Sequence, residues 1–200
     1  GRLATWNAGI CCGLARDRGS DDVGFLRAVV ADVQRRVDID PRRVFATGMS
    51  NGGMMAYRLA CEASDVFRAV AAVAGTDGTT TCQPGRAVPV FHIHARDDDR
   101  VLFTGGSGSA SDTHADFVSV GATVDKWARL DRCTGPARTV LDQPGVRCEV
   151  RTGCQDGVEL RLCVTETGGH SWPGGRKALG GQGSPALDAT AEIWAFFARQ

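Results

Sequence analysis

The hydrophobic positions of this chain alternate between helical spacing and short continuous runs. Between residues 20 and 37, polar residues open a segment whose apolar positions recur every three or four residues, and Pro41 bars its continuation. This pattern predicts an amphipathic helix. Its apolar face consists of Val23, Leu26, Val30, Val33 and Val37.

Further along the chain, short apolar runs and helix-spaced segments follow one another. Strands are predicted at residues 43–47, 69–74 and 88–94, and a hairpin at 147–151 and 158–165 around 155–157. Helices are predicted at residues 51–63, 112–130 and 185–198, with His114 near the start of the second, and a loop at 1–19. This alternation favours an α/β fold with a mainly parallel sheet flanked by helices, in a single domain over residues 1–200.

Composition and charge narrow the classes of partner. Apolar residues make up 42% of the 200 residues, which is typical of a globular protein. Lys and Arg number 23 together, as do Asp and Glu, so the formal net charge is zero. This balance gives no electrostatic case for nucleic acid or an anionic membrane as partner, and no apolar run is long enough to span a bilayer.

The chain contains eight cysteines, none of them in a C-x-x-C pair, which argues against zinc-ribbon and thioredoxin-like sites. Disulfides, and with them a secreted, extracellular protein, are the favoured interpretation, and buried free thiols are the alternative. Cys148 and Cys163 stand about equally far from the centre of the predicted hairpin, which places them opposite one another. The first residues do not read as a signal peptide, so we expect further N-terminal sequence in the secreted protein.

Residues 48–52 form a G-x-S-x-G motif, with a predicted strand before it and a predicted helix after it. That context indicates a nucleophile elbow, in which a sharp turn lifts the serine hydroxyl clear of the sheet. We expect both glycines to be needed, because such a turn leaves no room for side chains beside the serine. The motif predicts Ser50 as nucleophile and the backbone N–H of Asn51 as an oxyanion donor. The alternative is a plain strand–turn–helix junction with an incidental serine.

A serine nucleophile needs a general base and an acid that orients the base, in the chain order serine, acid, histidine. His170 stands in a glycine-rich loop just after the last predicted strand, where α/β folds place reactive groups, and it is the predicted base. The acid should follow the strand at residues 88–94. Asp97, Asp98 and Asp99 all stand there, and composition cannot choose among them.

His92 and His94 lie two apart in a predicted strand, so their side chains share one face, as metal ligands would. A buried strand also accommodates histidine as a hydrogen-bonded core residue, and this interpretation is favoured, so no metal site is predicted. Trp172, two residues after the predicted base, has two open interpretations: a core residue, or an apolar wall for the acyl or aromatic part of an ester.

Several longer motifs resemble the secreted esterases of the polyhydroxybutyrate depolymerase and feruloyl esterase group, which have the α/β-hydrolase fold. The resemblance covers nearly the whole chain, and its motifs stand at residues 6–9, 11–12, 21–25, 48–53, 57–62 and 170–175. The resemblance implies a serine esterase that works through an acyl-enzyme without a cofactor. Its substrate would be an extracellular polyester or a feruloylated or acetylated plant polysaccharide. Trp172 and Trp6 are the candidate substrate-binding residues.

The resemblance also selects among the three aspartates. A family segment like His-Gly-Thr-x-Asp-x-x-Val-Pro-Tyr aligns with residues 94–103 and implies Asp98 as the acid. This chain departs from that segment at Ala95, Arg96, Leu102 and Phe103. These changes bear on the local turn and on the rim of the substrate site. The resemblance further suggests that Cys133 pairs with Cys154. The four remaining cysteines would pair among themselves in an order that the sequence leaves open.

Members of that group resemble this chain only after a further N-terminal segment of several strands, which carries the second oxyanion donor. We therefore expect this chain to be the C-terminal part of the full fold. Without the segment, the strand at residues 43–47 would be an exposed edge and the chain a poor catalyst. The alternative from another functional class is a non-catalytic remnant or binding module of the same fold.

Overall fold

The computed structural model describes residues 4–113, 115–176 and 182–200, so His114 lies outside the described residues. The helices are α1 (Gly13–Asp17), α2 (Asp22–Arg36), α3 (Asn51–Glu62), α4 (Val120–Leu130) and α5 (Ala189–Phe197). The strands are β1 (Phe45–Met49), β2 (Ala69–Val73), β3 (Val90–Ala95), β4 (Arg138–Gln143), β5 (Val146–Arg151) and β6 (Leu160–Thr165).

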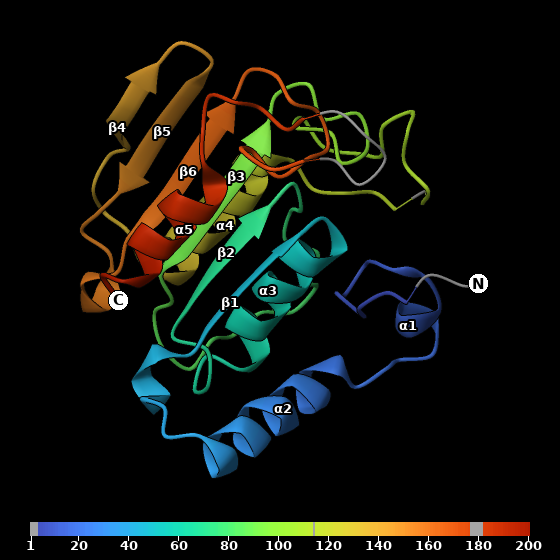
Figure 1. Ribbon diagram of the computed structural model, residues 1–200, viewed down its shortest axis with the longest axis vertical. Helices are drawn as coiled ribbons and strands as arrows, with labels where there is room; N and C mark the ends of the chain where they lie inside the picture. Colours follow the sequence, from blue (N-terminus) through green and yellow to red (C-terminus); the bar gives the residue numbers. More distant parts are fainter. Residues whose placement is uncertain (1–3, 114, 177–181) are drawn as a thin grey trace.

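The six strands form one sheet in the spatial order β1-β2-β3-β6-β5-β4. The first four are parallel, whereas β5 runs antiparallel to both of its neighbours. Figure 1 shows α5 on the near side of this sheet and α4 on the far side. The mainly parallel sheet flanked by helices is the α/β architecture that the sequence predicts.

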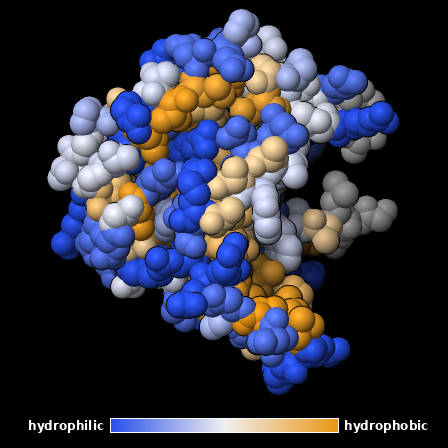
Figure 2. All heavy atoms as spheres, turned by 60° about the vertical axis from the view of Figure 1, so that its left-hand side comes forward, coloured by the Kyte–Doolittle hydropathy of each residue, from blue (hydrophilic) through white to orange (hydrophobic). Residues whose placement is uncertain are grey.

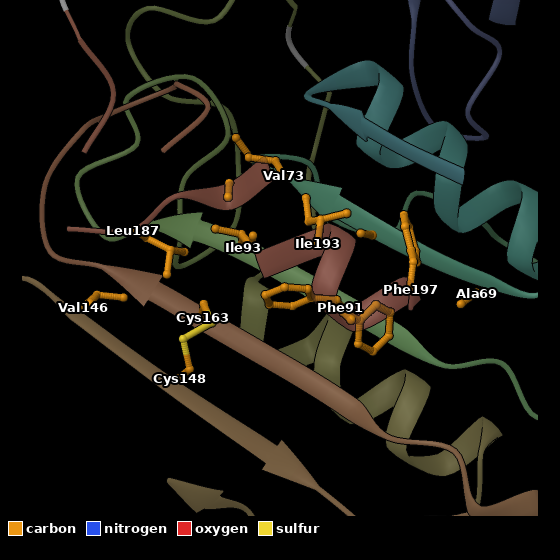
Figure 3. Packing of buried hydrophobic residues seen from close by; sticks show 14 residues of the cluster. Ala69, Val73, Phe91, Ile93, Val146, Cys148, Cys163, Leu187, Ile193 and Phe197 are labelled. Atoms are coloured by element: carbon orange, nitrogen blue, oxygen red, sulfur yellow. A yellow bond between two sulfur atoms is a disulfide. The ribbon is translucent and has the colours of Figure 1, made fainter. Parts of the chain in front are cut away.

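Each face of the sheet buries its own core, because successive side chains of a strand point to opposite faces. On the face covered by α5, Phe91 and Ile93 pack against Ile193 and Phe196. Figure 3 shows this cluster, which includes the Cys148–Cys163 disulfide. The opposite face packs against α3 and α4 through Tyr57, Val70, Val90, Val124 and Trp127.

The first strand lies two residues later than predicted. Pro41–Arg43 form a 3-10 turn, in which the Asp40 carboxylate accepts a hydrogen bond from the Arg42 N–H at 2.9 Å. This turn occupies the start of the predicted strand. β1 then continues through Gly48, which pairs with Ala72 of β2, up to the residue before Ser50.

The helix predicted at residues 112–130 is wrong over its first half. α4 begins only after Ser119, whose hydroxyl accepts from the Ala122 N–H at 3.0 Å and caps the helix. The preceding loop makes other contacts: the Ser107 hydroxyl donates to the Ala115 carbonyl at 2.6 Å. α5 likewise starts later than predicted, at Ala189.

The predicted hairpin is confirmed as β5 and β6, with Cys148 directly opposite Cys163. The sequence does not predict β4, which pairs with the outer side of β5. All of its residues except Leu141 are exposed, so no alternation of apolar and polar positions marks it. α1 is a single short helix within the segment predicted as a loop.

All eight cysteines are paired in the structure. The two predicted disulfides, Cys148–Cys163 and Cys133–Cys154, are confirmed. The order that the sequence leaves open is Cys61 with Cys82 and Cys11 with Cys12.

The predicted apolar face of α2 is only half buried. Val23, Leu26 and Val30, in the first part of the helix, pack against a cluster with α3. Val33 and Val37 are instead 41% and 57% exposed, because they lie beyond that contact. Figure 2 shows apolar atoms gathered at the lower end of the molecule, the end where α2 lies in Figure 1. Within the described ranges, no helix has both the length and the apolar composition needed to cross a membrane.

Candidate active site

Ser50 occupies the sharp turn between β1 and α3, with a positive φ of 56°. Few residues other than glycine adopt this conformation, and its strain is tolerated where the surroundings hold it. The Ser50 N–H donates to the Val73 carbonyl at 2.8 Å, and the Ser50 carbonyl accepts from the Met54 N–H at 2.9 Å. The turn is therefore fixed from both sides, by β2 and by the first turn of α3.

The two glycines of the motif differ in the space that surrounds them. A Cβ at Gly48 would lie 2.5 Å from the backbone carbon of Gly52, a distance that real Cβ contacts do not show. A Cβ at Gly52 would meet nothing within 4 Å. The expectation that both glycines are required is thus wrong for Gly52. A third glycine, Gly75, does need to be small, because a Cβ there would overlap the Ser50 carbonyl oxygen.

Asn51 is the first residue of α3, so its backbone N–H is one of those that a helix leaves without an internal partner. Its side chain makes two hydrogen bonds to the backbone of Trp6. The Asn51 Oδ1 accepts from the Trp6 N–H at 2.7 Å, and its Nδ2 donates to the Trp6 carbonyl at 2.9 Å. This pair of bonds fastens the segment around Trp6 beside the elbow.

Asp98 and His170 are in contact, although they are 72 residues apart in the chain. The His170 Nδ1 lies 2.9 Å from Asp98 Oδ2 and 3.1 Å from Oδ1. The other side of the carboxylate is held by the turn that follows β3, where Oδ1 accepts from the N–H groups of Arg100 at 2.9 Å and Val101 at 3.0 Å. A carboxylate held in this way fixes the orientation of the imidazole.

The surroundings of Asp98 favour its charged form. Burial opposes ionisation, since Asp98 is only 3% exposed. The hydrogen bonds from His170 and His94 outweigh that effect, with help from the charge of His170 and the Arg100 N–H, so the pKa of Asp98 lies below its usual range. This carboxyl is therefore an acceptor at neutral pH.

The other two aspartates have different surroundings. Both Asp97 and Asp99 are exposed. Asp97 Oδ1 accepts from the Gly169 N–H at 2.7 Å, so it supports the loop that carries His170 without touching the imidazole. The sequence offers Asp97 only as one of three candidates for the acid, and no spacing in the sequence marks its contact with Gly169.

A cavity of about 410 Å³ includes both Ser50 and His170 in its lining. The two side chains share this space, and within the described part of the chain no hydrogen bond joins them. The cavity also takes in Asn51, apolar side chains such as Met54, Val101 and Phe117, and the charged side chains of Arg16, Arg100 and Asp112.

The cavity lies at the carboxyl ends of the parallel strands. Ser50 follows β1, Asp98 follows β3 and His170 follows β6, and this is the edge at which α/β sheets bind ligands. A larger cavity of about 530 Å³ lies near Arg43 and Arg68, before the strands begin, and its lining contains no serine, cysteine or histidine. The smaller cavity is therefore the better candidate site.

The structure does not bring the two candidate tryptophans into the lining of this cavity. Trp172 is half-buried, packs against the core under α5 and donates from Nε1 to Thr190 Oγ1 at 3.0 Å. Trp6 is half-buried and stacks on Phe25 with ring centroids 6.3 Å apart. Contact of either residue with a substrate stays a prediction.

His92 and His94 are fully buried and hydrogen-bonded, as the favoured interpretation predicts. His92 contacts the Tyr57 hydroxyl at 2.7 Å, and His94 contacts the Val101 carbonyl at 2.8 Å. Over the described residues, no group of three histidine, cysteine or acidic side chains is placed to hold a metal ion.

Comparison with known protein families and curated proteins finds similarity to hydrolases. The sequence model of the prolyl oligopeptidase family matches residues 14–83, which include Ser50. The chain is 31% identical over 173 residues to feruloyl esterase B of Piromyces equi, a match covering 83% of this chain and 31% of that protein. It is 30% identical over 197 residues to feruloyl esterase D of Neurospora crassa, covering 96% of this chain and 59% of the relative.

A third relative is the putative esterase NocK of Nocardia uniformis subsp. tsuyamanensis, 35% identical over 170 residues, or 77% of this chain and 49% of that protein. The chain thus spans 31–59% of the length of these three relatives. The predicted similarity to feruloyl esterases and the α/β-hydrolase type of fold are both confirmed.

Proposed function

Because the chain is related to feruloyl esterases, we propose that it carries the catalytic site of a serine hydrolase that cleaves carboxylic esters. The observation that carries this proposal is the Asp98–His170 contact at 2.9 Å, with His170 and Ser50 in the lining of one cavity. The positive φ of Ser50 at a strand–helix turn supports the same assignment. The named relatives favour an ester over a peptide as the bond that is cleaved.

The proposed reaction proceeds through an acyl-enzyme. The Ser50 hydroxyl attacks the ester carbonyl carbon, and His170 Nε2 takes the serine proton and delivers it to the leaving alcohol. Asp98 holds His170 through Nδ1, which leaves Nε2 for this task. The Asn51 N–H donates to the oxyanion. Water, activated by His170, then releases the acid and regenerates Ser50.

Among the described residues no hydrogen bond joins Ser50 to His170, and the proposed reaction requires this bond to form when the ester binds. Catalytic hydrogen bonds are often long without substrate and tighten when it binds. The anchors of the two residues are independent: Ser50 is held by β2 and α3, and His170 by Asp98 and by the loop that Asp97 supports.

For the substrate, we propose an ester of plant cell-wall polysaccharide, in particular a feruloyl ester. Two of the relatives above are named feruloyl esterases, and the apolar side of the cavity, with Met54, Val101 and Phe117, suits an aromatic acyl group. We place the protein outside the cell, where its paired cysteines would remain oxidised.

The test of this function measures turnover of methyl ferulate, of a hydroxybutyrate oligomer and of a short-chain p-nitrophenyl ester, with Ser50→Ala as the matched variant. We expect turnover of methyl ferulate to exceed that of the oligomer and to vanish in Ser50→Ala, which removes one hydroxyl from a half-buried turn. Faster cleavage of the oligomer would favour a polyester substrate. Equal activity of the variant would reject Ser50 as the nucleophile, and no activity in the unmodified protein would support a non-catalytic module instead.

A further inference from the structure

A chain of buried hydrogen bonds joins α3 to the contact between Asp98 and His170. The Tyr57 hydroxyl lies 2.7 Å from His92 Nδ1, and His92 Nε2 lies 3.1 Å from His94 Nδ1. His94 Nε2 lies 2.8 Å from the Val101 carbonyl oxygen and 3.3 Å from Asp98 Oδ2. None of these side chains is more than 3% exposed.

The last acceptor of this hydrogen-bond chain determines which atom donates at each step. The Val101 carbonyl can only accept, so His94 Nε2 must carry a proton. With that proton on Nε2, His94 Nδ1 accepts, so His92 Nε2 must donate to it. His92 Nδ1 then accepts from the Tyr57 hydroxyl. One proton on each imidazole, at Nε2 in both rings, satisfies every step.

The opposite arrangement, in which His94 donates to His92 and His92 donates to Tyr57, leaves a group unsatisfied. It would need a second proton on His94, and it would leave the Tyr57 O–H without an acceptor among the described residues. Burial and the neighbouring His94 keep the pKa of His92 well below its usual range, so this ring is neutral. Burial, with the charge of Asp77, raises the pKa of Tyr57, so its hydroxyl keeps the proton that it donates.

His94, the last side chain of this hydrogen-bond chain, contacts the turn that holds Asp98. The His94 Nε2–H lies between the Val101 carbonyl and Asp98 Oδ2, while the Val101 N–H donates to Asp98 Oδ1 at 3.0 Å. His94 therefore fastens the residue that itself fixes the carboxylate. The other end of the chain, Tyr57, belongs to the same helix that begins directly after Ser50.

We propose that His94, held in its tautomer by His92 and Tyr57, is a positioning residue that sets the orientation of Asp98 against His170. The proposal rests on the proposed function of that site. The hydrogen-bond chain links the helix behind the nucleophile to the turn that carries the acid. Two parts of the site that are far apart in sequence are thereby held in a fixed position relative to each other. None of Tyr57, His92 and His94 touches the reacting atoms.

The structure offers a matched control for the test. Trp127 is as buried as Tyr57, stacks beside it at 5.8 Å and also donates one buried hydrogen bond, from Nε1 to Asp77 Oδ2 at 3.0 Å. That bond does not lead to Asp98. Tyr57→Phe and Trp127→Phe therefore each remove one buried donor from the same core, but only the first interrupts the chain.

The kinetic test measures kcat and KM per active site, counted with a serine-reactive phosphonate so that unfolded protein is excluded. We expect kcat to fall about tenfold in Tyr57→Phe and about a hundredfold in His94→Leu, with KM unchanged in both. These losses are smaller than the ~10⁴-fold loss expected when the acid itself is changed. His94→Gln, which restores an N–H donor near Nε2, should recover part of the loss. Trp127→Phe should leave kcat within about twofold of the unmodified protein.

A second readout does not depend on activity. NMR of the protein with ¹⁵N-labelled histidine should find the proton of both His92 and His94 on Nε2. The proton resonance of His170 Nδ1–H should shift in Tyr57→Phe and stay in place in Trp127→Phe. A proton on His94 Nδ1, or equal effects of the two phenylalanine variants on kcat, would overturn the proposal. Failure of the proposed function would look different, since the unmodified protein would then turn over no ester.

Discussion

At the scale of single residues, the three consecutive aspartates have the same chemistry and differ only in their surroundings. Asp98 is buried and held by two N–H groups and His170, whereas Asp97 and Asp99 are exposed. Composition could not separate them, because the difference arises from the turn after β3. The positions of Ser50 and His170 in the candidate site, by contrast, could be predicted from the sequence, since a strand–turn–helix motif and a glycine-rich loop after a strand are local features.

The first prediction separates the three aspartates by function. Asp98→Asn should lower kcat by orders of magnitude, on the scale of ~10⁴ seen when the acid of a serine triad is changed in this way, because the amide no longer fixes the imidazole tautomer. Asp97→Asn keeps an oxygen that can accept from Gly169, and Asp99→Asn changes an exposed side chain, so both should be mild. Equal losses at all three, or the largest loss at Asp99, would reject Asp98 as the acid.

The second prediction concerns Asp131, a buried carboxyl at the end of α4. Its Oδ1 accepts from the Val88 N–H at 2.9 Å, and its Oδ2 has no partner among the described residues. Burial raises the pKa of Asp131 to about 7, against the lowering effects of the Val88 N–H and of Arg86. The folded protein therefore binds a proton here that the unfolded chain, with a pKa of about 3.9, has released.

Because the unfolded state binds fewer protons at this site, the free energy of unfolding should fall by roughly 1.4 kcal/mol per pH unit between about pH 4 and 7, and level off above. Asp131→Asn removes this contribution. Urea unfolding of both proteins should find that the variant gains on the order of 2–3 kcal/mol relative to the original between pH 5 and 8. A stability difference that does not change with pH would contradict the assignment.

At the scale of elements, the sequence predicts those whose burial follows a regular pattern. β2 and β3 are continuously apolar, α3 follows a motif, and the β5–β6 hairpin has a clear turn. β4 lacks such a pattern because all of its residues except Leu141 are exposed. The Ser119 hydroxyl caps the start of α4. The upstream residues with helical spacing form a loop because they bond to residues 103–107.

The third prediction belongs to the elbow between β1 and α3. Gly48→Ala would place a Cβ against the backbone of Gly52, and this overpacking should lower the free energy of unfolding by about 1–3 kcal/mol. Gly52→Ala meets open space in a helix, so it should be neutral or stabilise by up to about 1 kcal/mol. Thermal or urea unfolding of the pair checks this, and equal destabilisation by both substitutions would be the contrary result.

At the scale of the whole molecule, the disulfides fasten the outer part of the sheet. Cys148–Cys163 joins β5 to β6, and Cys133–Cys154 joins the segment after α4 to the segment after β5. The first pairing could be predicted from the symmetry of a hairpin. The order of the four cysteines in the first half could not, because it depends on how separate segments meet.

The fourth prediction tests this connectivity. A peptide map of the unreduced protein should recover Cys61 with Cys82, Cys133 with Cys154 and Cys148 with Cys163. Replacing both Cys133 and Cys154 by alanine should lower the free energy of unfolding by roughly 2–4 kcal/mol, as expected for a loop of this size. A peptide in which Cys133 is joined to Cys148 would refute the arrangement.

The central claim, that this molecule is a serine hydrolase acting through Ser50, is tested most directly by reaction with a serine-reactive phosphonate. After inactivation, peptide mass spectrometry locates the adduct, and ester turnover is measured on the same sample. We predict one adduct per chain, on Ser50, with turnover lost in proportion to labelling, and no adduct in Ser50→Ala or while a competing ester occupies the site. Full turnover in labelled protein, or an adduct on another residue, would contradict the account.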